Sequence, residues 1–366
     1  MSIASEMTWN EKSMYPYIIQ QPEALKSILD NRKELTAAFV RLYQQVRPDR
    51  IYIIGSGTSQ NGAKIGREFM EHVLGIDVFL NVPSKLPTIR GERPLLIFVS
   101  QGGSSTNTVA AIEALKAYPM IALVGEEKCK INEICPNHML IGCPLELAGP
   151  KTLGYTSTIM AFYMMAIEAA HETGLEDDAA YEARLASLYE SVSHMAENIR
   201  RTEAWFDRNA DDLKQIGKYA VVGKYIGGLT ADESALKILE TVLVPATGYE
   251  FEEFLHGPMS MFAPDLGVIY HVTEDPIDKP RMLSLAKVNA DISKYVYLIT
   301  SDETIEGSGV LHLLSNHCPF CSVFEYILPC QMIGAVVPTL LGIQDKGHAL
   351  FERVGKDVPI KTAGGR

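Results

Sequence analysis

Short runs of consecutive apolar residues alternate with segments of helical periodicity along the first half of the chain. Strands that are apolar throughout are typical of a parallel sheet covered by helices on both faces. The expected strands cover residues 50–54, 77–81, 95–99, 120–124 and 139–142, and the expected helices cover residues 22–46, 60–74, 106–117 and 156–170. The pattern predicts an α/β fold in which a doubly wound three-layer sandwich surrounds the parallel sheet.

A similar order of elements starts again after a strongly charged helical segment at residues 176–215. We interpret this repetition as a degenerate internal duplication. The expected elements of the second half are strands at 218–222, 266–272 and 296–300, a helix at 231–243 and an apolar helix at 329–341. The expected organisation is an N-terminal arm and helix at 1–34, a first domain at 35–190, a second domain at 191–345 and a C-terminal tail at 346–366.

Composition and charge narrow the classes of partner. The 366 residues include 33 basic and 45 acidic side chains, which gives a formal net charge of −12, and they contain no basic run. This charge disfavours binding to nucleic acid or to anionic membranes. No apolar stretch approaches the ~20 residues of a membrane span, and the N-terminal residues lack the pattern of a signal peptide. We therefore expect a cytoplasmic protein whose six cysteines are reduced.

Two loops in the first half combine glycine with hydroxyl residues, and each follows a strong strand and precedes a helix. They cover Gly55 to Ser59 and Ser100 to Ser105. Glycine lets the backbone approach an anion closely, and hydroxyls and helix N-terminal amides can donate to phosphate oxygens. Such loops bind phosphate without lysine, which suits an acidic chain. The alternative is that both are ordinary turns with helix caps.

A dinucleotide site is a competing interpretation of the first loop. Its fingerprint requires glycine at a third position, which Gln60 occupies here. The acidic residue about 20 positions further on is Asp77, which stands at the start of its strand instead of the end. Both departures argue against a dinucleotide, and no cofactor is expected.

The second half contains a group of titratable residues. Glu233, Lys237 and Glu240 fall on one face of the helix expected at 231–243, because they are spaced by four and three residues. The alternative is a solvated helix face. His256 precedes Gly257-Pro258, close to several carboxylates, and a histidine there suits proton transfer near neutral pH.

Cys318 and Cys321 form a Cys-x-x-Cys pair in the second half. No second pair is spaced to complete a zinc site, and a thioredoxin-like role needs a different fold. We interpret these thiols as structural, and no metal is expected.

Five segments, in this order, resemble the sugar isomerase (SIS) domain family. The resemblance is to the isomerase part of glucosamine-6-phosphate synthase and to stand-alone relatives, which include fructosamine- and glucoselysine-6-phosphate deglycases and hexosamine-6-phosphate deaminases. It covers nearly the whole chain and implies two tandem SIS domains. The segments are Gly57-Thr58-Ser59, Ser100-Gln101-Gly102-Gly103, Leu153-Gly154-Tyr155-Thr156-Ser157-Thr158, Leu236-Lys237-Ile238-Leu239-Glu240 and Leu255-His256-Gly257-Pro258.

The resemblance also implies roles for individual residues. Glu240 matches the carboxylate that moves a proton between C1 and C2 of the sugar, and His256 matches the histidine that helps to open the sugar ring. Lys237 matches a lysine beside that glutamate, and Lys356 matches a tail lysine near the anomeric carbon. The positions that match phosphate or sugar contacts are Gly57, Thr58, Ser59, Ser100, Gln101, Gly102, Ser105 and Ser157. Because the family histidine commonly reaches across a dimer interface, a homodimer or higher homo-oligomer is expected.

Three departures from the synthase bear on the reaction. Gly102 replaces a serine of the synthase phosphate loop, and Asp357 and Val358 follow Lys356 where the synthase has a different sequence. A glutaminase domain would need a nucleophilic N-terminal cysteine, and residue 2 is Ser2. We therefore expect no synthesis of amino sugars from glutamine.

The chemistry expected is cleavage of the C–N bond of a glycated amino acid 6-phosphate or of an amino-sugar 6-phosphate. The substrate partner would be a small sugar phosphate. Two alternatives remain open, namely a ketose/aldose phosphosugar isomerase and a non-catalytic sugar-phosphate sensor. The sequence does not identify the amine or the stereochemistry of the sugar.

Overall fold

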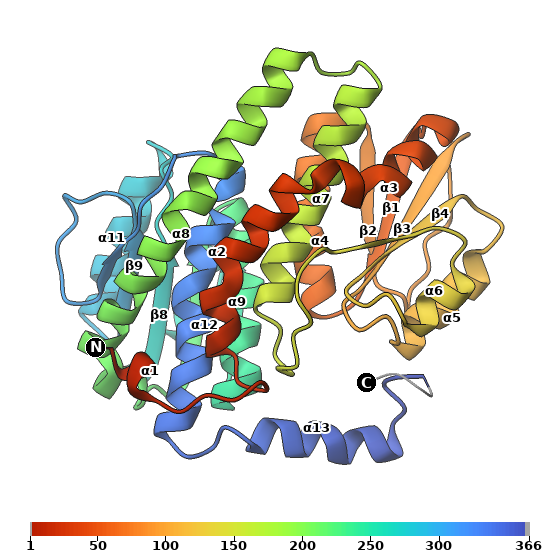
Figure 1. Ribbon diagram of the computed structural model, residues 1–366. Coiled ribbons are helices and arrows are strands. Elements are labelled where there is room, and N and C mark those ends of the chain that lie inside the picture. Colours follow the sequence, from red (N-terminus) through yellow and green to blue (C-terminus); the bar gives the residue numbers. More distant parts are fainter. Residues whose placement is uncertain (1, 363–366) are drawn as a thin grey trace. The chain divides into compact units, whose positions relative to one another are not determined.

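The computed structural model describes residues 2–362 as two compact units, each built on one five-stranded parallel sheet (Figure 1). Of the described residues, the first-sheet unit contains 23–146, 153–189 and 351–362. The second-sheet unit contains 2–22, 147–152 and 190–350. The domain boundaries expected from the sequence stay a prediction.

The sheet of the first-sheet unit has the strand order β2-β1-β3-β4-β5, with all strands parallel. Residues of β1, β3 and β4 are almost entirely buried, as expected for central strands. The strands are β1 (Arg50–Gly55), β2 (Asp77–Asn81), β3 (Pro94–Ser100), β4 (Met120–Val124) and β5 (His138–Leu140).

Helices cover both faces of this sheet. On one face α5 and α6 bury apolar residues against β1, β3 and β4, and on the other α4 packs on α7, which packs on α3. The helices are α3 (Arg32–Val46), α4 (Thr58–Leu74), α5 (Thr106–Leu115), α6 (Lys130–Ile134) and α7 (Leu153–Glu172). The predicted three-layer α/β architecture is confirmed for this unit.

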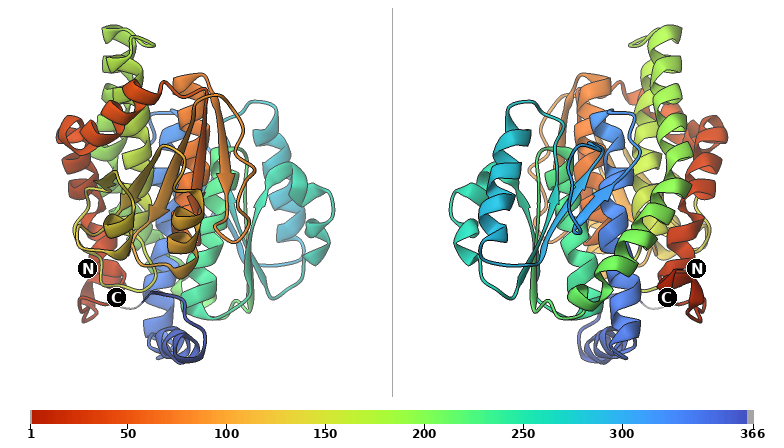
Figure 2. Two further views of the ribbon diagram at one scale, coloured as in Figure 1. Left: turned by 90° about the vertical axis from the view of Figure 1, so that its right-hand side faces the viewer. Right: turned by 90° about the vertical axis from the view of Figure 1, so that its left-hand side faces the viewer.

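The sheet of the second-sheet unit has the order β7-β6-β8-β9-β10, which matches the first sheet strand for strand. Figure 2 shows the strands and helices of this unit, in green to blue, from two sides. Helices α10 and α11 bury one face of this sheet, and α9 packs on α12. The strands are β6 (Lys218–Gly223), β7 (Ala246–Glu250), β8 (Leu266–His271), β9 (Val296–Thr300) and β10 (Val310–His312). The helices are α9 (Ile226–Val242), α10 (Phe251–Leu255), α11 (Asp278–Ala290) and α12 (Val323–Leu340).

The two sheets also share one unusual backbone conformation. The residue before α4 is Gly57, with φ 58° and ψ −136°, and the residue before α9 is Tyr225, with φ 50° and ψ −118°. A bulky residue rarely adopts a positive φ, so the tyrosine retains a turn that glycine forms without strain. The two halves therefore share the backbone conformation at this position, although the residue types differ.

Several elements differ from the sequence expectations. The expected helix at 22–46 is two helices, α2 (Tyr15–Asp30) and α3, which Asn31 separates, so α2 occupies part of the expected N-terminal arm. The arm also contains the short helix α1 (Ile3–Glu6). The expected polar tail contains α13 (Lys346–Asp357), which has no buried residue. The charged segment forms one 36-residue helix, α8 (Asp178–Leu213).

The segment 319–340, which contains α12, is long and apolar enough to cross a membrane by length and composition alone. However, 83% of its apolar window is buried inside the structure. Burial of this kind is typical of a core helix, and it explains why the segment needs so many apolar residues.

Candidate functional site

The first glycine- and hydroxyl-rich loop lies at the carboxyl end of β1 and leads into α4. Its Gly57 adopts a positive φ, and a Cβ atom there would meet nothing within 4 Å. Glycine is therefore favoured for its backbone conformation and not for lack of space. Thr58 and Ser59 occupy the first turn of the 17-residue helix α4, where N–H groups have no partner within the helix.

The second loop lies at the carboxyl end of β3, which pairs directly with β1. Ser100 Oγ lies 3.5 Å from Ser105 Oγ across the loop. The side-chain amide of Asn107 donates to Ser56 Oγ at 3.0 Å and so joins the two loops. In the order β2-β1-β3, successive strands are added on opposite sides of β1, so the strand order reverses between β1 and β3, which is where open α/β sheets bind ligands. The two loops therefore bring together glycine, hydroxyl groups and helix N-termini, which are the groups that anion-binding loops use.

Gln101 is held by the first turn of α7. Its side-chain nitrogen donates to the carbonyl of Gly154 and, at 2.8 Å, to Thr158 Oγ1. A Cβ atom on Gly154 would lie 2.1 Å from Gln101 Oε1, so this approach requires glycine at 154. Ser157 is fully buried in α7, and its Oγ has no hydrogen-bond partner among the described residues. A Cβ atom on Gly102 would meet no other atom within 4 Å.

The second loop also contacts the C-terminal tail, which the sequence did not indicate. The N–H of Thr106 donates to the carbonyl of Ile360 at 3.1 Å, and the N–H of Thr362 donates to the carbonyl of Ser104 at 2.8 Å. Ser105 and Lys361 form an antiparallel bridge. Lys356, the tail residue expected near the anomeric carbon, lies exposed in the last turn of α13. The tail therefore reaches the phosphate-type loop through residues 360–362.

The three titratable residues of α9 form an ion-pair cluster. Lys237 Nζ lies 3.0 Å from Glu233 Oε1 and also donates to Glu240. Glu233 and Lys237 are fully buried, whereas the Glu240 side chain is 32% exposed. Burial alone would lower the pKa of Lys237, but the two carboxylates outweigh burial and raise it. The alternative of a solvated helix face is therefore wrong for Glu233 and Lys237.

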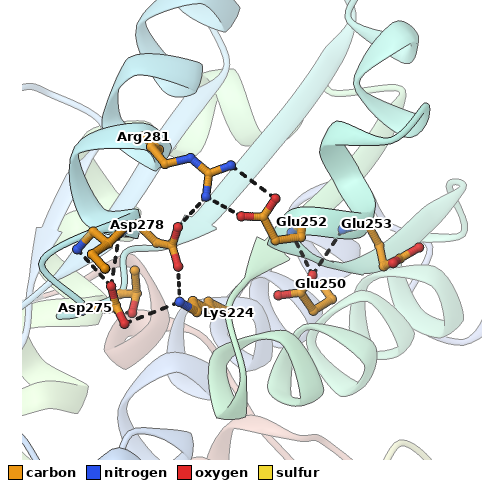
Figure 3. Close-up of polar contacts among 9 residues, drawn as sticks. Lys224, Glu250, Glu252, Glu253, Asp275, Asp278 and Arg281 are labelled. Atoms are coloured by element: carbon orange, nitrogen blue, oxygen red, sulfur yellow. Dashed lines mark hydrogen bonds and ion pairs between the residues drawn. The ribbon is translucent and has the colours of Figure 1, made fainter.

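His256 is exposed and ends the short helix α10. The carboxylate of Glu250 caps this helix by accepting from the N–H groups of Glu252 and Glu253 at 2.6 and 3.1 Å. Arg281 of α11 then pairs with Glu252 and with Asp278 (Figure 3). The polar network thus fixes the turn that presents His256. Among residues 2–362, no hydrogen bond or ion pair joins His256 to Glu240, whose carboxylate pairs with Lys237.

A metal site would need several cysteine, histidine or carboxylate side chains close together. Cys318 and Cys321 form no disulfide within residues 2–362. Within the described part of the chain, no group of three or more His, Cys, Asp or Glu side chains is placed to hold a metal ion.

Comparisons with known proteins agree with this architecture. No family model matches the chain. A glutamine–fructose-6-phosphate aminotransferase (isomerizing) from Gloeobacter violaceus is 22% identical over 357 residues, which cover 94% of this chain and 56% of that protein. The chain spans about half the length of the curated relatives it matches.

Two solved structures are more similar in sequence. A candidate phosphosugar isomerase from Clostridium difficile 630 superposes with a TM-score of 0.84 at 26% identity, covering 91% of this chain and 94% of that one. A candidate sugar-binding protein from Salmonella typhimurium LT2 gives 0.79 at 26% identity, covering 89% and 99%. Sequence and fold together confirm that the chain resembles the sugar isomerase (SIS) domain family and is built from two SIS-like domains.

Proposed function

We propose that this chain is an enzyme that binds a hexose 6-phosphate and cleaves a C–N bond at its C1 or C2 atom. The substrate is a glycated amino acid 6-phosphate or an amino-sugar 6-phosphate. The observation that carries the proposal is the pair of linked loops at the carboxyl ends of β1 and β3, which Asn107 joins through Ser56. The relatives whose names mention phosphosugars support the same class of ligand.

The two loops supply what a phosphate monoester needs in an acidic chain. Ser59, Ser100 and Ser105 bring hydroxyl groups, and the N-termini of α4 and α5 lie there. Amides and hydroxyls bind a phosphate dianion locally, so the net charge of −12 does not oppose binding at this edge of the sheet. Ser157, which the resemblance assigns to the sugar, is a buried hydroxyl of this unit that would gain a partner.

Glu240 is the candidate general base. It is partly exposed and can reach a ligand, while Lys237 holds its carboxylate in place. In a ketosamine 6-phosphate, the carboxylate would take the proton from C1 and return it at C2, which gives an imine at C1. Water then adds to C1 and expels the amine, so the products are the aldose 6-phosphate and the free amine. The resemblance assigns the loops and Glu240 to one sugar molecule, and His256 to opening of its ring.

The test is to incubate the purified chain with a panel of glycated amino acid 6-phosphates and amino-sugar 6-phosphates, and to measure release of amine and hexose 6-phosphate. We expect turnover of at least one, and loss of about 100-fold or more in rate for Glu240→Gln. Interconversion of ketose and aldose without amine release would assign an isomerase instead. Tight binding without turnover of any compound would assign a sensor.

We further propose that the chain works in the cytoplasm as a homodimer or higher homo-oligomer, with the domain boundaries stated above. The exposed position of His256 supports an oligomer, because a partner subunit can reach an exposed residue. Light scattering after size-exclusion chromatography measures the mass, and a monomer at micromolar concentration would contradict the oligomer.

A further inference from the structure

The second-sheet unit contains a cavity of about 460 Å³, a volume ordinary for a small-molecule site. It lies at the carboxyl ends of β6, β8 and β9, where Gly227, Thr273 and Ser301 contribute to its wall. In the order β7-β6-β8, this is the point at which the strand order reverses. The cavity therefore occupies the position in the second sheet that the phosphate-type loops occupy in the first.

The wall of this cavity is chemically different from those loops. The segment after β8 is Thr273-Glu274-Asp275, where the first sheet has hydroxyl and glycine residues. Lys224, the wall's ammonium group, pairs with Asp275 and with Asp278 (Figure 3). The carboxylate of Glu274 accepts from Ser301 Oγ at 2.5 Å. Glu274 also pairs with Lys279 of α11 at 3.2 Å, so the ammonium groups of Lys224 and Lys279 are both paired with carboxylates and offer a phosphate dianion no excess of positive charge.

Two deeply buried acceptor atoms line the same cavity. Glu325 is 4% exposed and His271 is fully buried. Glu325 Oε1 and His271 Nε2 have no hydrogen-bond partner among the described residues. His271 Nδ1 lies 2.9 Å from the Gly227 carbonyl and must donate to it, so Nε2 is left as the ring's acceptor. The ring of Tyr326 stacks on His271 at 4.8 Å and fixes its orientation.

Such groups are costly to bury without partners, so they indicate a bound molecule that supplies donors. Burial lowers the pKa of His271 to about 4 and keeps the ring neutral, and burial raises the pKa of Glu325 to about 8. A cation beside Glu325 would favour its ionised form. A primary ammonium group has three N–H donors and one positive charge, which matches two buried acceptors and the carboxylate of Glu274.

We propose that this cavity is a second ligand site, which binds a sugar-sized molecule through a primary ammonium group held by Glu325 and His271. The site is separate from the proposed general base. The cavity contains Ile226 at the start of α9, and Glu240 lies 14 residues further along that helix, which corresponds to about 21 Å. An amine bound here is an effector or a second substrate and does not touch Glu240.

The experiment compares D-glucosamine with D-glucose by isothermal titration of the full chain, because the two sugars differ in one ammonium group and one hydroxyl group. We expect binding of glucosamine, at least tenfold weaker binding of glucose, and no competition by inorganic phosphate. Glu325→Gln should weaken glucosamine binding at least tenfold. Ser59→Ala and Glu240→Gln, which lie outside the cavity, should bind glucosamine as the wild type does.

A second variant is needed because Glu325→Gln could lose binding by failing to fold. Ser322 lines the cavity without being fully buried, so Ser322→Phe should fill the cavity and abolish binding with little change in melting temperature. The proposal is wrong if folded wild-type protein does not bind glucosamine at about 10 mM, if glucose binds equally well, or if both cavity variants bind like the wild type. These results leave the proposed C–N cleavage untouched, because that reaction is measured separately.

Discussion

The Nζ atom of Lys237 donates a hydrogen bond to the carboxylate of Glu240, three residues further along α9. The same ammonium group lies 3.0 Å from the fully buried Glu233. One lysine therefore neutralises a carboxylate of the core and orients a carboxylate that reaches the surface. A change of Lys237 should therefore lower stability, whereas a change of Glu240 should lower activity and leave stability nearly unchanged.

Lys237→Met should lower the free energy of unfolding by about 3–5 kcal/mol, because it leaves the buried Glu233 without its cation. Glu240→Gln should change it by less than about 1 kcal/mol, since Glu240 is partly exposed. Urea unfolding followed by tryptophan fluorescence measures both. The double variant Glu233→Gln with Lys237→Met is the matched control and should recover part of the loss. Equal stability of Lys237→Met and wild type would contradict the cluster's structural role.

Gly57→Ala should cost about 1–2 kcal/mol of stability, because an L-residue is strained at φ 58°. It should also raise KM for a sugar 6-phosphate at least tenfold, because the new methyl group enters the open space over the loop. Gly75→Ala is the control, since Gly75 has φ 65°, is equally unhindered and lies at the other end of α4. It should show a smaller stability loss, because φ 65° and ψ 26° are the left-handed conformation that L-residues adopt at moderate cost, and its KM should be unchanged. If both variants keep the wild-type KM, the first loop does not bind the phosphate.

Arg281→Gln should lower kcat several-fold with little change in KM. Arg281 and Glu252 are both about half exposed, so their ion pair adds little stability. The pair ties α10 to α11, however, and α10 ends at His256. Arg281→Lys should restore part of kcat, because it keeps the charge. Arg200→Gln removes a comparable surface pair with Glu197 and should have no effect. A kcat unaffected by Arg281→Gln would show that this network does not position His256.

The unfolding free energy should depend on Glu325 in a defined pH window. Burial raises the pKa of Glu325 from 4.5 to about 8 in the folded chain, so the folded state holds a proton that the unfolded state has lost between these values. The contribution of Glu325 to stability is therefore complete below pH 4.5 and declines as the pH rises toward 8, by about 1.4 kcal/mol per unit.

Glu325→Gln isolates this effect, because glutamine does not titrate and fills the same space. The difference in unfolding free energy between wild type and variant should move in favour of the variant from pH 5 to pH 8. His271, whose pKa is lowered, acts in both proteins and cancels from the difference. A constant difference across this range would show that Glu325 is ionised in the folded chain.

The central strands and the position of the two glycine- and hydroxyl-rich loops after them could be predicted from the sequence. Runs such as residues 120–124 are apolar throughout, which marks them as buried strands. In a parallel sheet the carboxyl ends of all strands lie at the same edge, so the loops that follow the strands lie together there. The edge strand β7 was not predicted, because its residues Ala246 to Glu250 are mixed and mostly half-buried. The tail helix α13 was missed because none of its residues is buried, so tertiary packing does not mark it.

The candidate site shows a similar division. The spacing of Glu233, Lys237 and Glu240 placed them on one face of α9, but spacing cannot say whether that face is buried. The contact between Gln101 and Gly154 joins residues 53 positions apart, and the bridge between Ser105 and Lys361 joins residues still further apart in the chain. Contacts of this range depend on the tertiary fold and leave no local pattern.

Helix α8 determines where the chain can be cut to express its two compact units separately. The boundary between the two compact units falls between Tyr189 and Glu190, inside this continuous 36-residue helix. A gene fragment ending there would leave a helix end whose last four carbonyl groups lack partners. Expression of either half alone therefore requires a fragment that keeps the whole of Asp178–Leu213 or replaces the cut with a designed cap.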